Sequence, residues 1–441
     1  MAMTVADREL ILRPPADLLR DRPELGRMAA RLALRYVHRE LVTDEMLQAM
    51  GAALWRALWR ALDADLERAR AAAGLGVLPI LIESDQPAVL QLPWETLHHP
   101  ELGFLGRDPA FALSRRLGPA SDTAPILEQG PLRVLLFTSL PEDLDPERGR
   151  LDIESEQDAV QEALAPWIAE GLVDLRMPND GRFGTLTAEV RAFRPHLVFL
   201  SGHGRFHRQP LADGPDRGEF VFEGVHGASA PIPDTEIAAA FVGSPVRCLV
   251  FAACESGKSA SDALNSGLAR RLGLRGLPHV VGMRESILDR SGIRFARAFC
   301  DALARRERVD LALQGARRAI TRPLEGADGL DPESAELSLG QWCLPMLLSA
   351  DPSRPLIDWE FDPKPPARRP VNQSLATVTL PPRLLGRRKE LRTLEGQLGR
   401  ARRPWPAPWP WGSSATAGRS WPGRRGRKTP GRISASSWNW P

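Results

Sequence analysis

Two residues of this chain combine a reactive side chain with a position that favours catalysis, His203 and Cys254. His203 lies between two glycines directly after the apolar run 196–201, and Cys254 follows the apolar run 247–253. A cysteine thiolate is a nucleophile, and a neighbouring imidazole can accept the thiol proton. If the fold brings the two side chains together, they form a candidate His/Cys dyad.

The two apolar runs must position these side chains. Short apolar runs, partly β-branched and bounded by Gly or Pro, are typical of strands buried on both faces of a parallel sheet. In open α/β sheets the chemistry lies just past the carboxyl ends of the strands. We therefore expect the two strand ends to be adjacent, with the first strand breaking at 202–204.

A structural role is the alternative for each residue, because lone histidines are often structural and free cysteines are often buried. His207 and His226 lack the glycine setting of His203 and are expected in solvated loops. Cys254 precedes Glu-Ser-Gly, where the backbone N–H groups of a loop or helix start would favour a thiolate and bind an oxyanion. The remaining cysteines are expected to be packing residues: Cys248, Cys300 and Cys343.

A competing motif overlaps the cysteine. Gly257-Lys258-Ser259 matches the end of a phosphate-binding loop, but the full pattern requires glycine where the chain has Ala252. The run before His203 also ends in Leu-Ser-Gly and offers no magnesium-binding Asp. Both departures argue against nucleotide binding at this position.

The order of short motifs resembles CHAT domains, which are caspase-like cysteine peptidases related to separases and caspases. The blocks around the two reactive residues, Leu200-Ser-Gly-His-Gly204 and Ala253-Cys-Glu-Ser-Gly257, look like the His and Cys boxes of that family. The likeness covers roughly residues 75 to 350. Further blocks keep the order and spacing of the family: 92–97, 277–282, Asp289, 295–303, 312–317 and 342–345.

The resemblance implies a fold and an activity. The fold would be a caspase-like three-layer α/β sandwich with a central, mostly parallel sheet, preceded by an α+β N-terminal layer. The activity would be that of a cysteine endopeptidase acting on a protein or peptide substrate, with His203 and Cys254 as the dyad and the amide of Gly204 in the oxyanion hole. It requires no metal or organic cofactor. The alternative is a catalytically silent CHAT-fold module that binds a partner in signalling.

Asp289 is the candidate for substrate recognition. In separase-like relatives an acidic residue at about this distance after the cysteine lines the pocket for a basic P1 side chain. The segment 283–289 departs from the family pattern because it lacks the common Trp. The alternative for Asp289 is a cap or turn before the following helix.

The rest of the chain suggests a division at the Gly-, Pro-, Ser- and Asp-rich segment 118–131. Residues 1–125 would form the N-terminal layer and 126–350 the peptidase core of alternating strands and helices. Within the N-terminal layer we expect an edge strand at 8–13 and two further strands at 77–83 and 88–92. A helix with a buried Leu/Trp stripe is expected from Asp44 to about Gly74. Trp94 is expected to anchor this layer on the sheet, and the alternative is that it borders a substrate or regulatory pocket. Glu95 is expected to be an ordinary surface or capping carboxylate.

The C-terminal part has a different character. Residues 351–382 are rich in Pro and charge and are expected to be a linker. Leu384 to Leu398 resembles the start of the NTPase modules of STAND-type signalling proteins, but no phosphate-binding loop follows. Residues 401–441 contain six Trp, many Arg and no acidic residue. We therefore interpret 383–441 as a truncated or frameshifted NTPase start with a basic, disordered tail. Nucleic-acid binding is expected only if this tail is genuine.

Composition excludes several classes of protein. No run approaches the 18 or more apolar residues of a membrane span, and charged residues stand near the N-terminus where a signal peptide would be apolar. The four cysteines lack CxxC spacing, which argues against a zinc site or a disulfide framework. We expect a cytoplasmic protein that works with regulatory NTPase or repeat modules.

Overall fold

The computed structural model describes residues 4–6, 9–58, 62–117, 126–143, 153–207, 217–254, 277–285, 287, 289–321, 340–349 and 351–366. All of them belong to one compact unit that spans residues 1–392. The predictions for 383–441, and for the linker beyond residue 366, lie outside the described residues.

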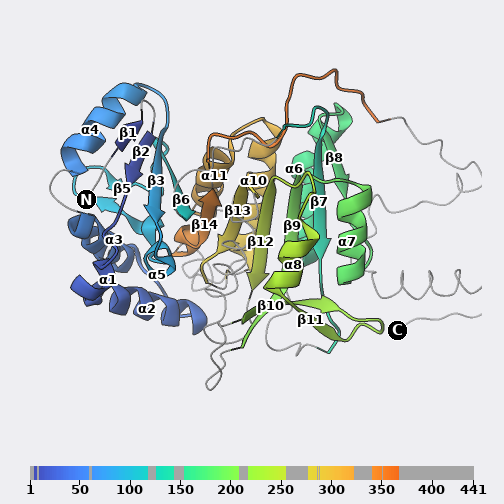
Figure 1. Ribbon diagram of the computed structural model, residues 1–441, viewed down its shortest axis with the longest axis horizontal. Helices are drawn as coiled ribbons and strands as arrows, with labels where there is room; N and C mark the ends of the chain where they lie inside the picture. The colour runs from blue at the N-terminus through green and yellow to red at the C-terminus, as the bar shows by residue number, and fades with distance from the viewer. Residues whose placement is uncertain are drawn as a thin grey trace, which may run out of the picture. The chain divides into compact units, whose positions relative to one another are not determined.

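One twelve-stranded sheet runs through the described part of the chain (Figure 1). In spatial order its main path is β1 (Thr4–Ala6), β2 (Glu9–Leu12), β3 (Leu78–Ser84), β6 (Phe111–Leu117), β14 (Pro345–Ser349), β13 (His279–Met283), β12 (Cys248–Cys254), β9 (Leu197–His207), β10 (Arg217–Glu223) and β11 (Ser229–Pro233). Off this path, β7 (Leu132–Thr138) pairs with β9 and β8 (Val173–Arg176) pairs with β7. The neighbouring strands β2, β3, β6 and β14 are parallel to one another, and so are the neighbouring strands β13, β12, β9, β7 and β8. This pairing confirms the mostly parallel sheet. A separate small sheet pairs β4 (His98–His99) with β5 (Gly103–Phe104).

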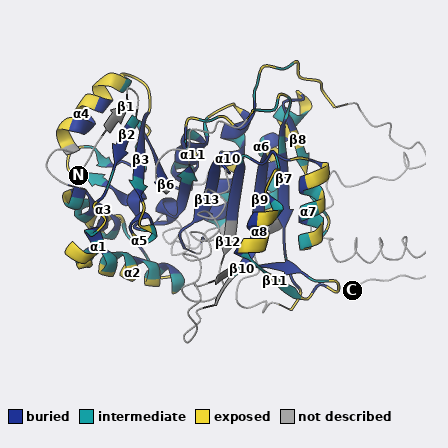
Figure 2. Cartoon of the chain, viewed as in Figure 1, coloured by how far each residue is buried: buried dark blue, intermediate teal, exposed yellow. Residues whose placement is uncertain are grey.

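Helices cover both faces of the sheet, so the core has three layers (Figures 1 and 2). The strands alternate between two hydrophobic clusters: Leu197 and Phe199 of β9 belong to one, and Val198 and Leu200 to the other. The first cluster is covered by α6 (Ile153–Ala169), α10 (Asp289–Ala304) and α11 (Val309–Thr321). The second is covered by α7 (Phe183–Ala192) and α8 (Asp234–Ala240).

The N-terminal layer packs its helices on the strands β2, β3 and β6. Its elements are α1 (Leu18–Asp21), α2 (Pro23–Val37), α3 (Asp44–Leu58), α4 (Leu62–Ala73), α5 (Pro87–Leu90) and the 3-10 turn η1 (Trp94–Thr96). The predicted Leu/Trp stripe is a core face, with Met50 and Leu54 fully buried. Trp94 is buried as expected, and its indole N–H donates to the carbonyl of Val89 (2.8 Å). None of the described helices is long and apolar enough to cross a membrane.

Three local predictions in this region were wrong or incomplete. The strand expected at 88–92 is the helix α5, because Pro87 stands in its first turn, where a missing N–H costs nothing. The expected edge strand at 8–13 is interior, since β2 pairs with β1 on one side and β3 on the other. The helix predicted from Asp44 is divided: α3 ends at Leu58 and α4 begins at Leu62, and 59–61 lie outside the described residues.

The sheet continues across the division expected at 125/126, since β6 pairs directly with β14. The predicted linker also begins as a packed segment. Leu356 and Ile357 are buried, and the amide of Asp358 donates to the carbonyl of Glu128 (3.0 Å). The start of the predicted linker therefore packs against the core, whereas residues 362–366 are exposed. The division itself stays a prediction.

Glu95 corrects another expectation, because it is buried with an exposed fraction of only 2%. Its carboxylate accepts hydrogen bonds from Arg115 of β6 (2.5 Å) and Arg317 of α11 (3.2 Å), which are themselves buried. Arg317 also donates to the carbonyl of Pro345 (2.9 Å) at the start of β14. Burial lowers the pKa of Arg317 to about 10. The Arg115–Glu95–Arg317 cluster therefore connects the N-terminal layer to the helix α11 and to β14, the next strand of the sheet after β6.

His279 and His196 are buried at the amino ends of β13 and β9. His279 lies between the Ser349 hydroxyl (Nδ1···Oγ 2.9 Å) and the Arg354 carbonyl (Nε2···O 3.1 Å), so a neutral ring can accept from the first and donate to the second. Burial lowers the pKa of His279 to about 4. Burial and the nearby Arg133 likewise lower the pKa of His196 to about 4. Both rings are therefore neutral near pH 7.

Removing the buried carboxylate should destabilise the protein strongly. Glu95→Gln should lower the free energy of unfolding by about 3–5 kcal/mol, because it leaves two buried guanidinium groups without their counter-charge. Urea unfolding followed by circular dichroism measures this loss. Glu101→Gln, a change at an exposed carboxylate, should stay within about 0.5 kcal/mol of the original protein. A loss below about 1 kcal/mol in Glu95→Gln would contradict the role of the cluster.

Acid should destabilise the protein through His279. An unfolded histidine has a pKa near 6.5, whereas His279 titrates near 4 in the folded chain. Between these values the unfolded state binds more protons, so the free energy of unfolding should fall as the pH drops from about 6.5 to 4. His279 alone accounts for about 3 kcal/mol of this fall. Urea unfolding across this pH range should show a shallower dependence in His279→Asn and the original dependence in His226→Asn, since His226 is exposed. The same pH dependence of the free energy of unfolding in all three proteins would refute the role of His279.

Candidate active site

The candidate dyad residues occupy paired positions on neighbouring strands. β12 and β9 are parallel and stay in register from Cys248 opposite Leu197 to Cys254 opposite His203. Cys254 is the last residue of β12. The expected adjacency of the strand positions that carry His203 and Cys254 is therefore confirmed for the backbone.

His203 lies within a strand and not in the loop expected after it. β9 continues to His207 because β10 pairs with its second half, with Val221 opposite His203 and Arg217 opposite His207. β7 pairs with the first half of β9 and ends with Thr138 opposite Ser201. His203 therefore lies just beyond the point where β10 replaces β7 on one edge of β9, while β12 occupies the other edge. Its exposed fraction is 7%.

Gly202 shows which face of β9 His203 occupies. A Cβ atom at Gly202 would lie 2.5 Å from the ring of Phe220, which belongs to the cluster under α7 and α8. Successive residues of a strand point to opposite faces. Ser201 and His203 therefore face the opposite side, covered by α6 and α10. Only glycine fits at position 202, which gives the first glycine of the His box a packing reason.

A cluster of four hydrogen-bonded polar side chains lies on this face around Ser201, two residues before His203. The Ser201 hydroxyl donates to a carboxylate oxygen of Glu156 (2.5 Å), and the Gln157 amide donates to the Thr138 hydroxyl (2.9 Å). Glu156 and Gln157 are in the first turns of α6, and Ser201 and Thr138 are paired across β9 and β7. The sequence analysis missed this group. The available signal was the pair of hydroxyl residues, Thr138 and Ser201, that follow the apolar runs 134–137 and 197–200.

Two helices begin at the edge of the sheet that carries the candidate dyad. α6 follows the parallel strand β7, and α10 follows the parallel strand β13. They pack on each other and run in the same direction, since Trp167 of α6 donates to Asp301 of α10 (3.2 Å) and Glu162 approaches Arg297 (3.8 Å). The positive ends of both helix dipoles therefore point toward the edge where His203 and Cys254 lie.

The other predicted site residues are only partly described. Asp289 is the first residue of α10, and Gly204 pairs with Phe220. The side chains of Cys254 and Asp289 and all of residues 255–276 lie outside the described residues, so the S1 and capping alternatives for Asp289 both stay open. His207 belongs to β9, whereas His226 is exposed in the turn between β10 and β11, as expected.

The remaining cysteines are buried packing residues, as predicted. Burial raises the pKa of the Cys248, Cys300 and Cys343 thiols above that of a free thiol. The sulfur of Cys343 lies 3.3 Å from the hydroxyl of Tyr36. At neutral pH these thiols stay protonated, and protonated thiols are poor nucleophiles.

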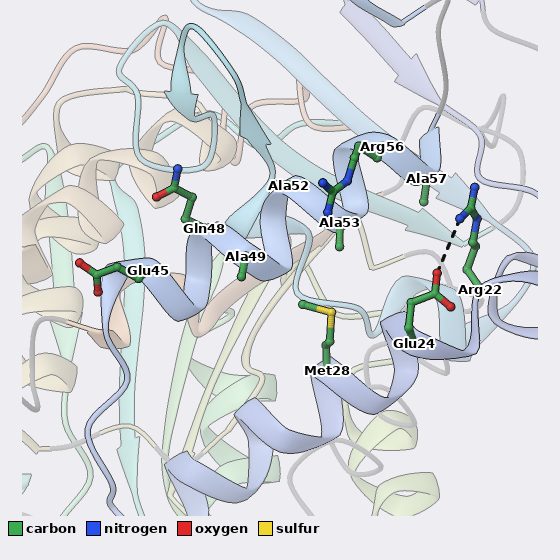
Figure 3. A pocket seen from close by; sticks show the side chains of 10 residues that line it. All are labelled: Arg22, Glu24, Met28, Glu45, Gln48, Ala49, Ala52, Ala53, Arg56 and Ala57. Atoms are coloured by element: carbon green, nitrogen blue, oxygen red, sulfur yellow. Dashed lines mark ion pairs between the residues drawn. The ribbon is translucent and has the colours of Figure 1, made fainter.

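No cluster of three or more metal-ligating side chains occurs among the described residues. A groove of about 740 Å³ lies between α2 and α3, and Figure 3 shows the Arg22–Glu24 ion pair (3.7 Å) at one end of it. Its lining comes from Arg22, from α2 and from one face of α3: Glu24, Met28, Glu45, Gln48, Ala49, Ala52, Ala53, Arg56 and Ala57. Because no residue of β9, β12 or α10 lines it, this groove is distinct from the candidate active site.

Comparison with known families gives one extensive match. The profile of the CHAT domain matches residues 48–363. The match includes β9, β12 and α10 as well as most of the N-terminal layer. No curated protein sequence matches the chain.

Several solved structures resemble this one at low sequence identity. The Saccharomyces cerevisiae separase in its complex with securin is 14% identical, with 68% of this chain and 17% of that chain covered and a TM-score of 0.36. The Arg-specific cysteine proteinase gingipain R is 10% identical, with 80% and 79% covered and a TM-score of 0.37. The Drosophila initiator caspase Dronc is 14% identical, with 54% and 95% covered and a TM-score of 0.28. The chain thus spans less than a fifth of the separase chain.

Proposed function

Since the chain belongs to the CHAT domain family and has a caspase-like α/β fold, we propose that it is a cysteine endopeptidase with His203 and Cys254 as its catalytic dyad. The observation that carries this proposal is the pairing of Cys254 with His203 at the end of β12. Paired positions on adjacent strands are among the closest neighbours in a sheet. The proposed setting is a regulatory or signalling system in which NTPase or repeat modules control the peptidase.

The proposed reaction follows the logic of an activated nucleophile. His203 accepts the thiol proton of Cys254, and the thiolate attacks the scissile carbonyl carbon of a peptide. The C–N bond breaks, the nitrogen takes the proton from His203, and an acyl-enzyme thioester remains. Water then loses a proton to His203 and hydrolyses the thioester, which releases the acid and restores the thiol. No step requires a metal ion or an organic cofactor.

Local electrostatics support these roles. The positive ends of α6 and α10 at this edge favour a negative thiolate and the negative oxygen of the tetrahedral intermediate. We assign the backbone N–H groups of Gly204 and of the residues following Cys254 as the donors to that oxygen. Each such donor is typically worth about 10²–10³-fold in rate.

We further propose that Asp289 recognises a basic P1 side chain. Asp289 starts α10 at the edge of the sheet that holds the candidate dyad. A guanidinium group binds a carboxylate through two parallel hydrogen bonds, so Arg would be preferred over Lys. An apolar P1 residue would leave the carboxylate without a partner, and this difference is the source of the specificity.

Cys254 should react selectively in the native protein. Brief treatment with iodoacetamide near pH 7, followed by peptide mapping, should modify Cys254 at least about tenfold faster than the buried cysteines, because their thiols stay protonated. His203→Ala should slow the modification of Cys254, and Cys254→Ala should abolish cleavage of a peptide library without unfolding the protein. Cys300→Ala, which removes a buried thiol outside the proposed dyad, should retain cleavage. Equal, slow modification of all four cysteines would favour the silent CHAT-fold module instead.

Asp289 should determine the P1 preference. In a library that varies only the P1 residue, the original protein should cleave after Arg and Lys, and Asp289→Ala should lose those substrates by about tenfold or more while other substrates change little. Asp301→Asn, which changes a carboxylate on the far part of the same helix α10, serves as the control and should keep the original P1 preference. A preference for Asp or small apolar residues, or an unchanged profile in Asp289→Ala, would return Asp289 to a capping role.

A further inference from the structure

A carboxylate of α6 is bound to the face of β9 that also carries the candidate catalytic histidine. Ser201 and His203 are two residues apart on one strand and share the face covered by α6, as the packing of Gly202 against Phe220 shows. Their Cα atoms are therefore about 6–7 Å apart along the strand. The Glu156 carboxylate accepts a hydrogen bond from the Ser201 hydroxyl, so it is held beside Ser201, the preceding residue on the same face as His203.

The charge of Glu156 also acts on α10, the other helix that covers this face. The raised pKa of the buried Cys300 thiol on α10 is caused first by burial and next by the negative charge of Glu156. The side chain therefore acts on the interior between α6 and α10. This is the layer that Ser201 and His203 face.

From these contacts we propose that Glu156 is a positioning residue, held by Ser201, whose carboxylate orients His203 and stabilises its imidazolium form. The inference rests on the role proposed for His203. In the reaction His203 becomes positively charged when it takes the thiol proton, and a carboxylate within about 4–6 Å favours that charged form. Ser201 fixes one oxygen of the carboxylate, and Gln157, bound to Thr138, fixes the same turn of α6 against β7.

Two other charged groups of α10 are directed away from His203. Arg294 of α10 donates to the carbonyl of Ile320 and so points toward α11. Asp301 binds Trp167 and pairs with Arg305, which places it near the far ends of α6 and α10. The remaining titratable or charged groups on the elements around this face include Glu154, Asp158 and Glu162 on α6, Asp289, Arg290, Arg297 and Cys300 on α10, Arg217, Glu219 and Glu223 on β10, Arg284 and Glu285 after β13, and Cys254 on β12.

The test follows the titration of His203 directly. The full-length protein is labelled with ¹³C at Cε1 of its eight histidines, and the His203 signal is assigned by its loss in His203→Gln. Glu156→Gln should move the titration midpoint of His203 to lower pH by about one pH unit or more, since the imidazolium loses its counter-charge. Ser201→Ala should move it in the same direction by less. Glu162→Gln on the same helix, whose carboxylate faces Arg297, should leave it unchanged.

Peptidase kinetics give a second readout. Glu156→Gln should lower kcat by about tenfold or more with little change in KM, and Glu156→Asp, which keeps the charge, should recover part of the loss. An unchanged His203 midpoint in both Glu156→Gln and Ser201→Ala overturns the proposal, even if the protein is an active peptidase. A shifted midpoint in a protein that cleaves nothing supports the role of Glu156 while refuting the proposed enzyme. Ser201→Ala keeps the test decisive if Glu156→Gln does not fold.

Discussion

The candidate active site depends on the register between β9 and β12. A slip of one residue in a sheet moves every side chain of the strand to the opposite face, and a slip here would separate His203 from Cys254. Both faces of β9 resist such a slip. On one face Phe199 packs near Phe295 of α10, with ring centroids 6.5 Å apart. On the other face, Gly202 leaves just enough space for Phe220, where any side chain would collide.

The N-terminal layer is joined to this sheet by charge as well as by apolar packing. Glu95 binds Arg115 on a strand of its own layer and Arg317 on a helix of the core. Taking three charges out of water is costly, and the cost is offset only when each group keeps its hydrogen-bonding partners. Such a cluster tolerates little displacement of α11 against β6. It therefore specifies how the two parts of the sheet meet at β6 and β14.

Much of the fold and the position of the candidate dyad could be predicted from short sequence patterns. Buried parallel strands are nearly continuous apolar runs, so β7, the first half of β9 and β12 were recognised. The second half of β9 was not, because its strand state depends on pairing with β10 and its own sequence, rich in Gly and His, favours a loop. Glu95 was misjudged for a similar reason. One of its partners, Arg317, lies 222 residues away in the sequence, and no local sequence pattern reveals a contact between residues so far apart.

The difference between a loop and a strand at His203 matters for the proposed chemistry. A histidine in a loop depends on its neighbours to hold its backbone, whereas the backbone at His203 pairs with β12 on one side and β10 on the other. Proton transfer benefits when the base is held in place before the substrate arrives. In this chain a ladder of backbone hydrogen bonds provides that placement, and the first turns of α6 add a carboxylate on the same face.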